Sequence, residues 1–286
     1  MQGKKLQKPL LIMLLILVLA GCSSVKLGYR FMDNAIRWKI NDYVSLNAQQ
    51  SGVLTRGIND FHRWHQATQL SKYASFMQRK AIQFEAETLT SDDFSKIYDE
   101  AFAMASVSLD RLMPVITDML LSLSPEQVQL TLNKMEKESA KDLKEDFGIT
   151  PAQRLLKRQN KMIKRLVKWT GRLNKAQLAI IAGWAKTMPV DEGLRVARQK
   201  KFTSGLTKQL NDRSNPERFK RSILAQVKTP ERFSSAQYNQ SYAKRKQLTL
   251  ELMSDLFNSL TAPQKAQLIR STKKYQADFL YLAPRK

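Results

Sequence analysis

The chain has 286 residues, of which 48 are lysine or arginine and 25 are aspartate or glutamate, so its formal net charge is +23 at pH 7. Its single cysteine excludes a disulfide framework, a cysteine-rich zinc site and an iron–sulfur cluster built by this chain alone. Two histidines offer few groups for metal binding or histidine-based catalysis. A hydrophobic content of 43% is that of a folded protein, and the excess of positive charge indicates an anionic partner or surface.

The N-terminal segment has the features of a cleaved export signal. Three lysines precede an apolar run over 9–20, which is too short for a membrane-spanning helix of about 20 residues. The run ends in Leu19-Ala20-Gly21-Cys22, which resembles the lipobox of bacterial lipoproteins. This resemblance implies cleavage before Cys22, a diacylglycerol on its sulfur and acylation of the new amino group.

The two residues after the lipobox bear on the location of the protein. Ser23 and Ser24 stand where an aspartate favours retention at the inner membrane in lipoproteins of this type. The resemblance therefore implies a lipid anchor in the outer membrane, with the body facing the periplasm. We expect residues 1–21 to be the signal peptide, 22–26 a lipidated tether and 27–286 the body.

The body has the periodicity of α-helices almost throughout. Apolar residues recur at three- and four-residue spacing, as in Met32, Ile36 and Ile40. No stretch combines sustained apolar alternation with hairpin turns. We expect an all-α bundle of about eight to eleven helices, in which Pro114 kinks or ends a helix that begins near Ser91.

Several helix starts are marked by one recurring pattern. A Ser, Thr or Asn follows an apolar residue, and a Gln falls three residues later, which is the arrangement of a capping box. The pattern occurs at 123–127, 149–153, 173–177 and 260–264. It predicts helices that begin near 124, 150, 174 and 261, and prolines predict two more near 191 and 215.

Charge is unevenly distributed along the chain. Residues 85–146 carry 6 basic and 14 acidic side chains, whereas 147–286 carry 30 basic and 8 acidic ones. This change places a subdomain boundary near Gly148.

The strongest charge signal is a predicted basic amphipathic helix over 151–175, which contains no acidic residue. Such a helix can lie on an anionic membrane or bind an acidic partner. It can equally pack in the core and expose a solvated basic face. The candidate anion-binding residues are Arg154, Lys157, Arg158, Lys161, Lys164, Arg165, Lys168 and Arg172.

No set of residues predicts catalysis, a metal site or a cofactor site. Glu138-Ser139 is similar to the Glu-Ser pair of lytic transglycosylases, but the motifs that should follow it are missing. His62 and His65 fall on one helix face and supply at most half of a zinc site. The four tryptophans are interpreted as core anchors. We expect no nucleic-acid partner, because a protein tethered in the periplasm seldom meets nucleic acid.

Two family resemblances concern the body. The first rests on residues after the lipobox, which are Gly28-Tyr29-Arg30, Asp33, Trp38, Asp42-Tyr43, Leu46, Gln49, Trp64-His65, Leu70 and Tyr73. With these residues the chain resembles an uncharacterised family of Gram-negative lipoproteins, known as a domain of unknown function. This resemblance implies no activity or site.

The second resemblance is local. The pattern at 123–127, and more loosely at 260–264, is similar to the Leu-Thr-x-x-Gln motif of Spy-type periplasmic chaperones. Those are small, basic, all-helical proteins that cradle unfolded clients, whereas this chain is about twice as long.

Together these observations predict a non-enzymatic, lipid-anchored envelope protein. Its basic body is expected to bind anionic lipid, lipopolysaccharide, a wall polymer or a protein partner. The alternative is a chaperone-like holder of unfolded periplasmic clients.

Overall fold

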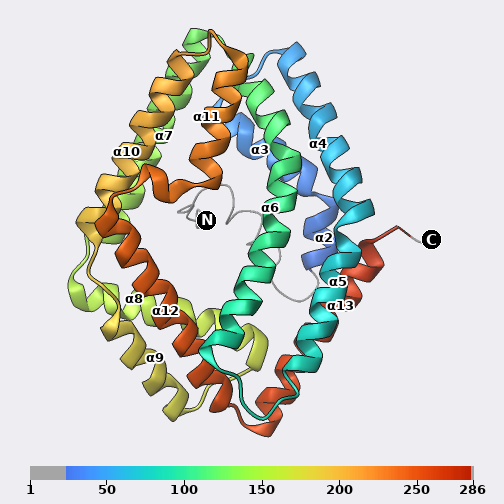
Figure 1. Ribbon diagram of the computed structural model, residues 1–286, viewed down its shortest axis with the longest axis vertical. Helices are drawn as coiled ribbons and strands as arrows, with labels where there is room; N and C mark the ends of the chain where they lie inside the picture. Colours follow the sequence, from blue (N-terminus) through green and yellow to red (C-terminus); the bar gives the residue numbers. More distant parts are fainter. Residues whose placement is uncertain (1–23, 285–286) are drawn as a thin grey trace. The chain divides into compact units, whose positions relative to one another are not determined.

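The computed structural model describes residues 24–284, which form helices and no β-strand (Figure 1). The prediction of an all-α fold is confirmed. Twelve α-helices are described rather than eight to eleven, because single residues, Phe31 and Gln69, split two helical stretches without disturbing their apolar spacing. The elements are α2 (Ser24–Arg30), α3 (Met32–Tyr43), α4 (Ala48–Thr68), α5 (Leu70–Gln83), α6 (Ser91–Leu121), α7 (Pro125–Phe147), α8 (Pro151–Thr170), α9 (Lys175–Thr187), α10 (Glu192–Asn211), α11 (Pro216–Lys228), the 3-10 helix η1 (Pro230–Phe233), α12 (Ala236–Asn258) and α13 (Ala262–Leu282).

The predicted helix starts are confirmed, since α7, α8, α9, α10, α11 and α13 begin within one or two residues of the expected positions. At α8 the Thr150 hydroxyl accepts the backbone N–H of Gln153 at 3.2 Å, and the Gln153 side chain accepts the N–H of Thr150 at 2.9 Å. The expectation for Pro114 is corrected in one respect: α6 continues through it to Leu121. The Thr117 hydroxyl beside it donates to the carbonyls of Met113 and Pro114, both at 3.1 Å.

The described helices form two compact units, each assembled from three separate chain segments. Unit 1 contains the described chain up to His65, Ala105–Gly148 and Asp191–Asn239; unit 2 contains Gln66–Met104, Ile149–Val190 and the described chain from Gln240. One of the junctions falls between Gly148 and Ile149. The units are therefore not successive halves of the chain.

Unit 1 is built around an apolar core from α4, α6, α7, α10 and α11. Its buried members include Ile58, Leu109, Leu210 and Phe219, of which Ile58 has no exposed surface. A close approach within this unit brings α4 against α6 at Gly57, where a Cβ atom would lie 2.6 Å from a methyl carbon of Val115.

Unit 2 has its own core. Ile181 of α9, Leu256 of α12 and Met162 of α8 belong to one buried apolar cluster. The first and last helices of the unit, α5 and α13, pack together, with the rings of Tyr73 and Phe279 5.7 Å apart.

In unit 1 two capping boxes are joined through their glutamines. The Gln50 amide donates to the side-chain oxygen of Gln127 at 3.0 Å and to the carbonyl of Ser122 at 2.7 Å. The Gln127 amide donates to the side-chain oxygen of Gln50 at 2.9 Å and to the carbonyl of Ser45 at 2.6 Å. Each glutamine oxygen also accepts the backbone N–H of its own cap residue. These hydrogen bonds therefore join the N-terminus of α4 to the N-terminus of α7.

Unit 2 repeats this arrangement at the starts of α9 and α13. The amides of Gln177 and Gln264 donate to each other's oxygens at 2.8 and 2.9 Å. They also donate to the carbonyls of Ser259 and Arg172, at 3.0 and 2.7 Å. In all four cases the accepting carbonyl lies five residues before the partner glutamine. Every donor and acceptor of these amides has a partner, which permits their burial.

Candidate functional site

An open pocket of about 720 Å³ lies in unit 1, between the end of α3 and one face of α7. The chain leaves α3 at Val44, which is extended (φ −141°, ψ 130°) and buried, so the last two residues of the helix stay beside α7. These are Asp42 and Tyr43. From α7 come residues spaced by three and four positions, which share one helix face; they include Lys134, Lys137, Glu138 and Lys141.

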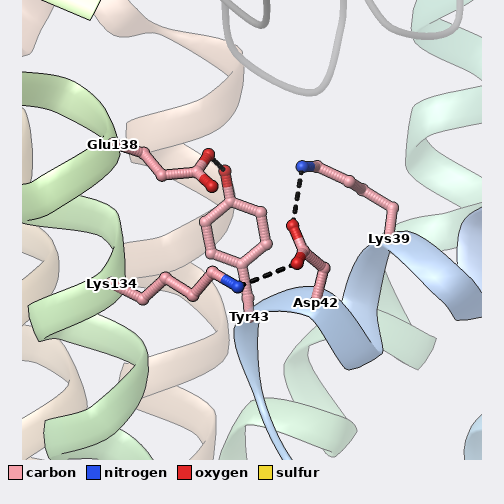
Figure 2. A network of polar contacts seen from close by, with 5 residues as sticks. All are labelled: Lys39, Asp42, Tyr43, Lys134 and Glu138. Carbon is pink, nitrogen blue, oxygen red and sulfur yellow. Dashed lines mark hydrogen bonds and ion pairs between the residues drawn. The ribbon is translucent and has the colours of Figure 1, made fainter. Parts of the chain in front are cut away.

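A network of polar contacts joins the two helices at this pocket (Figure 2). Lys134 donates to one carboxylate oxygen of Asp42 at 2.8 Å, and Lys39 donates to the other at 3.2 Å. The Tyr43 hydroxyl donates to Glu138 at 2.7 Å. The ammonium groups of Lys39 and Lys134 also lie 4.7 and 5.9 Å from the centre of the Tyr43 ring, within reach of a cation–π attraction.

The electrostatics of the pocket favour a bound anion. Hydrogen bonds from Lys134 and then Lys39 lower the pKa of Asp42, so its carboxylate stays ionised and neutralises part of their charge. Lys137 and Lys141 are exposed and have no ion-pair partner among the described residues. The lining therefore carries three lysines, Lys134, Lys137 and Lys141, against Asp42 and Glu138, and this net positive charge suits a small negatively charged group.

The sequence singled out only part of this pocket. Asp42-Tyr43 was among the residues that carry the family resemblance, while Glu138 and the α7 lysines were not predicted as site residues. Their spacing was the available signal, because Lys134, Glu138 and Lys141 recur at helical intervals. What the sequence did not show is that this face meets the end of α3.

The predicted basic helix is α8 in unit 2, with Arg172 just beyond its end at Thr170. Its candidate residues divide by exposure. Lys161, Lys164, Arg165, Lys168 and Arg172 are exposed, whereas Arg154, Lys157 and Arg158 are half-buried.

The candidate anion-binding residues on α8 differ in their contacts. Arg158 donates to the carbonyl of Ala185 at 2.8 Å, which ties α8 to α9. Lys164, Arg165 and Arg172 are exposed and have no ion-pair partner in the described part of the chain. On the apolar side of this amphipathic helix, Leu156 is 56% exposed, so that side is only partly covered by the rest of unit 2.

The predicted lipidation site, Cys22, and the predicted signal segment lie outside the described residues. Helix α2 begins at Ser24, within the range 22–26 assigned to the tether, and Val25 is buried. Among residues 24–284, no helix is long and apolar enough to cross a membrane.

The two histidines contact Tyr29 rather than a set of metal ligands. Its ring lies 4.7 Å from that of His62, and its hydroxyl lies 3.0 Å from Nδ1 of His65. The described residues contain no group of three or more His, Cys, Asp and Glu side chains that could hold a metal ion.

The interpretation of all four tryptophans as core anchors is wrong for Trp38, which is 71% exposed. Trp64 and Trp184 pack against buried apolar clusters, and Trp169 stacks on Tyr275 with ring centres 4.9 Å apart. Helical spacing alone does not show which side of α3 faces the core.

Comparison with known proteins gives one match, to a family. No match was found among curated proteins or among solved structures. Residues 42–239 match a family of unknown function, DUF6279, and this range includes the pocket residues from Asp42 onward and the whole of α8. Because the match covers more than half of the chain, the protein belongs to the DUF6279 family.

Proposed function

We propose that the protein is a non-enzymatic lipoprotein, anchored through Cys22 in the outer membrane and facing the periplasm, whose basic helical body binds an anionic envelope component. The observation that carries the proposal is the surface of α8. Lys164, Arg165 and Arg172 are exposed without ion-pair partners in the described chain. No acidic residue occurs between 151 and 175. Such a surface lowers its electrostatic energy by binding anions.

The lipobox supports the anchor. The only cysteine stands at the position where this motif requires it, after a basic segment and an apolar run. An anchored body is held near the membrane, so weak contacts act at a high effective concentration. Each basic residue near an anionic surface contributes about 1 kcal/mol. Three or four such residues are enough for measurable attachment.

The pocket in unit 1 offers a second, smaller site for one negative group. There Lys137 and Lys141 stand beside the ionised Asp42 network. This pocket differs from the surface of α8, because α8 presents its basic residues in an extended row rather than around one cavity. The chaperone alternative receives no separate support from the glutamine motif, since Gln127 and Gln264 cap helices and bond to other glutamines.

Binding is tested on the full mature chain carrying Cys22→Ser, which removes the lipid. We expect this protein to sediment with vesicles of phosphatidylethanolamine and phosphatidylglycerol, and to be released at about 0.5 M salt, where screening is strong. Reversal of Lys164, Arg165 and Arg172 to Glu should abolish sedimentation.

The matched control reverses Lys72, Lys186 and Lys244, which are exposed on α5, α9 and α12 of the same unit. This variant has the same net charge but leaves α8 intact, and it should still bind. If both variants bind equally, total charge rather than α8 is responsible, and α8 is a solvated face.

The anchor has its own test. Cells fed an alkyne fatty acid should label the wild-type protein but not Cys22→Ser. Label retained in the mutant would contradict acylation at Cys22. Aggregation assays with unfolded clients at low and high salt examine the chaperone alternative, which requires suppression that persists when charges are screened.

A further inference from the structure

Three large apolar side chains of α2, α3 and the residue between them are exposed. Leu27 is 58% exposed, Phe31 55% and Trp38 71%. The opposite side of the same segment is packed, because Val25 and Met32 are buried. The segment is therefore apolar on two sides, and only one of them faces the core of unit 1.

These three residues lie on one line. Helical hydrogen bonding continues across the junction between α2 and α3, since the N–H of Phe31 donates to Leu27 at 3.2 Å and that of Ala35 to Phe31 at 2.9 Å. At about 100° per residue, Leu27, Phe31 and Trp38 fall within a sector of about 40°. They span about 16 Å along the helix axis. We call them the outer stripe.

The surroundings of the outer stripe are polar or basic rather than acidic. The other exposed positions of this face are Gly28, Arg30, Asn34, Ala35 and Asn41. The nearby acids are already engaged by cations, Asp33 by Arg37 at 3.4 Å and Asp42 by Lys39 at 3.2 Å. An exposed apolar line on a helix, flanked by polar residues and free of unpaired acids, is the pattern of a helix that lies in a membrane interface.

We propose that the outer stripe lies against the bilayer that holds the lipid on Cys22, so that α2 and α3 run along the membrane surface. This proposal rests on the proposed anchor at Cys22. Leu27 follows Cys22 by only five residues, and that length of chain spans at most about 17 Å. Tryptophan prefers the boundary between headgroups and acyl chains.

The acylated full mature chain, reconstituted in phosphatidylethanolamine and phosphatidylglycerol vesicles, provides the first test. Bromine on the acyl chains quenches tryptophans that reach them. We expect brominated vesicles to quench the wild type, and Trp38→Phe to lose most of this quenching. The control Trp184→Phe should keep it, because Trp184 lies on α9, outside the proposed vesicle-binding helix α8, and packs against the apolar core of unit 2.

A second test removes the lipid with Cys22→Ser. Changing Leu27, Phe31 and Trp38 to Ser should lower vesicle partitioning about tenfold or more, given the apolar area lost. The matched variant changes Ile82, Leu130 and Val190 to Ser, which are 61%, 63% and 87% exposed and lie outside both α8 and the outer stripe. It should partition like the parent chain.

The two proposals fail in distinguishable ways. If Cys22 carries the alkyne label but Trp38→Phe leaves quenching unchanged, the stripe proposal is overturned and the anchor stands. If the label is absent, the anchor fails, and the partitioning of the unacylated variants decides the stripe. Concentration-dependent dimers that the Leu27, Phe31 and Trp38 variant abolishes, without quenching by bromine, would assign the stripe to a second copy instead. Quenching seen only while residues 9–20 are uncleaved would assign it to the signal segment.

Discussion

Gln177 and Gln264 exchange hydrogen bonds through their side-chain amides while each also accepts the backbone N–H of its own cap residue. Gln177 has no exposed surface and Gln264 is 9% exposed. The pair thus fixes the start of α9 against the start of α13 inside unit 2. Loss of one partner leaves the other with one buried amide N–H unmatched and its oxygen with one donor fewer, which costs more than the lost bond itself.

Replacement of Gln177 by Ala should lower the unfolding free energy by about 2–4 kcal/mol, since two buried polar groups lose partners. Gln153→Ala is the matched control, because Gln153 belongs to an intact capping box at α8 but is exposed. It should cost about 1 kcal/mol or less. Urea unfolding followed by circular dichroism measures both.

A double-mutant cycle measures the interaction energy between Gln177 and Gln264. The combined Gln177→Ala and Gln264→Ala variant should cost less than the two single changes together, by about 1–3 kcal/mol. Strict additivity would show that the two capping boxes act independently.

Gly57→Ala should destabilise unit 1 by about 1–3 kcal/mol, although alanine favours a helix by about 1 kcal/mol over glycine. The added Cβ would lie 2.6 and 3.0 Å from the two methyl carbons of Val115. Val115→Ala in the same chain should recover part of the loss. Gly193→Ala, in α10 with no atom within 4 Å of the new Cβ, should instead stabilise the protein slightly. Thermal melts distinguish these outcomes by sign.

The stability of the protein should fall between pH 6.5 and pH 4. Burial lowers the pKa of His65 from 6.5 to about 4, and burial also lowers the pKa of His62. The unfolded chain therefore binds a proton at His65 in a pH range where the folded protein does not. The contribution of His65 to the unfolding free energy is fully present above pH 6.5. It decreases as the pH falls, by up to about 3 kcal/mol at pH 4.

His65→Gln is the variant that tests this pH dependence. Glutamine does not titrate and can still accept the hydroxyl of Tyr29, which lies 3.0 Å from Nδ1 of His65. Most of the slope between pH 6.5 and 4 should disappear in urea titrations at several pH values. A slope equal to that of the wild type would assign the effect to other groups.

Lys134→Met should raise the pKa of Asp42, because the hydrogen bond from Lys134 is the largest cause of its lowering. Carbon-13 titration of the carboxyl group reads this directly. Lys137→Met is the control, since Lys137 lines the same pocket without contacting Asp42. An equal rise in both variants would mean that general charge, rather than the 2.8 Å contact, sets the pKa.

Features that depend on neighbouring residues were predictable from the sequence. The capping boxes at Thr150 and Asn174 are set by side chains three residues apart, so the helix starts follow from local chemistry. The helical class follows from apolar spacing in the same way.

Features that depend on distant residues were not predictable. Nothing local to Gln177 indicates that its partner is Gln264, 87 residues later. A fifth member of the motif set, which ends at Gln50 of unit 1, was also missed, although Gln50 follows Leu46 and Asn47 in the same pattern. The exposure of Trp38 was not predictable for a related reason. Its segment is apolar on two sides, and the sequence does not show which side is buried.

The pairing of α5 with α13 has a consequence for the order in which the chain is made. The side chain of Gln66 donates to the carbonyl of Leu282, 216 residues later. At about 5–20 residues per second, a growing chain waits roughly 10–40 s between the synthesis of these two residues. During that time α5, in which Leu70 and Ala74 are buried once the protein has folded, has no α13 to pack against. A chain that stops before α13 lacks the helix that packs on α5, so unit 2 stays incomplete until α13 has been made.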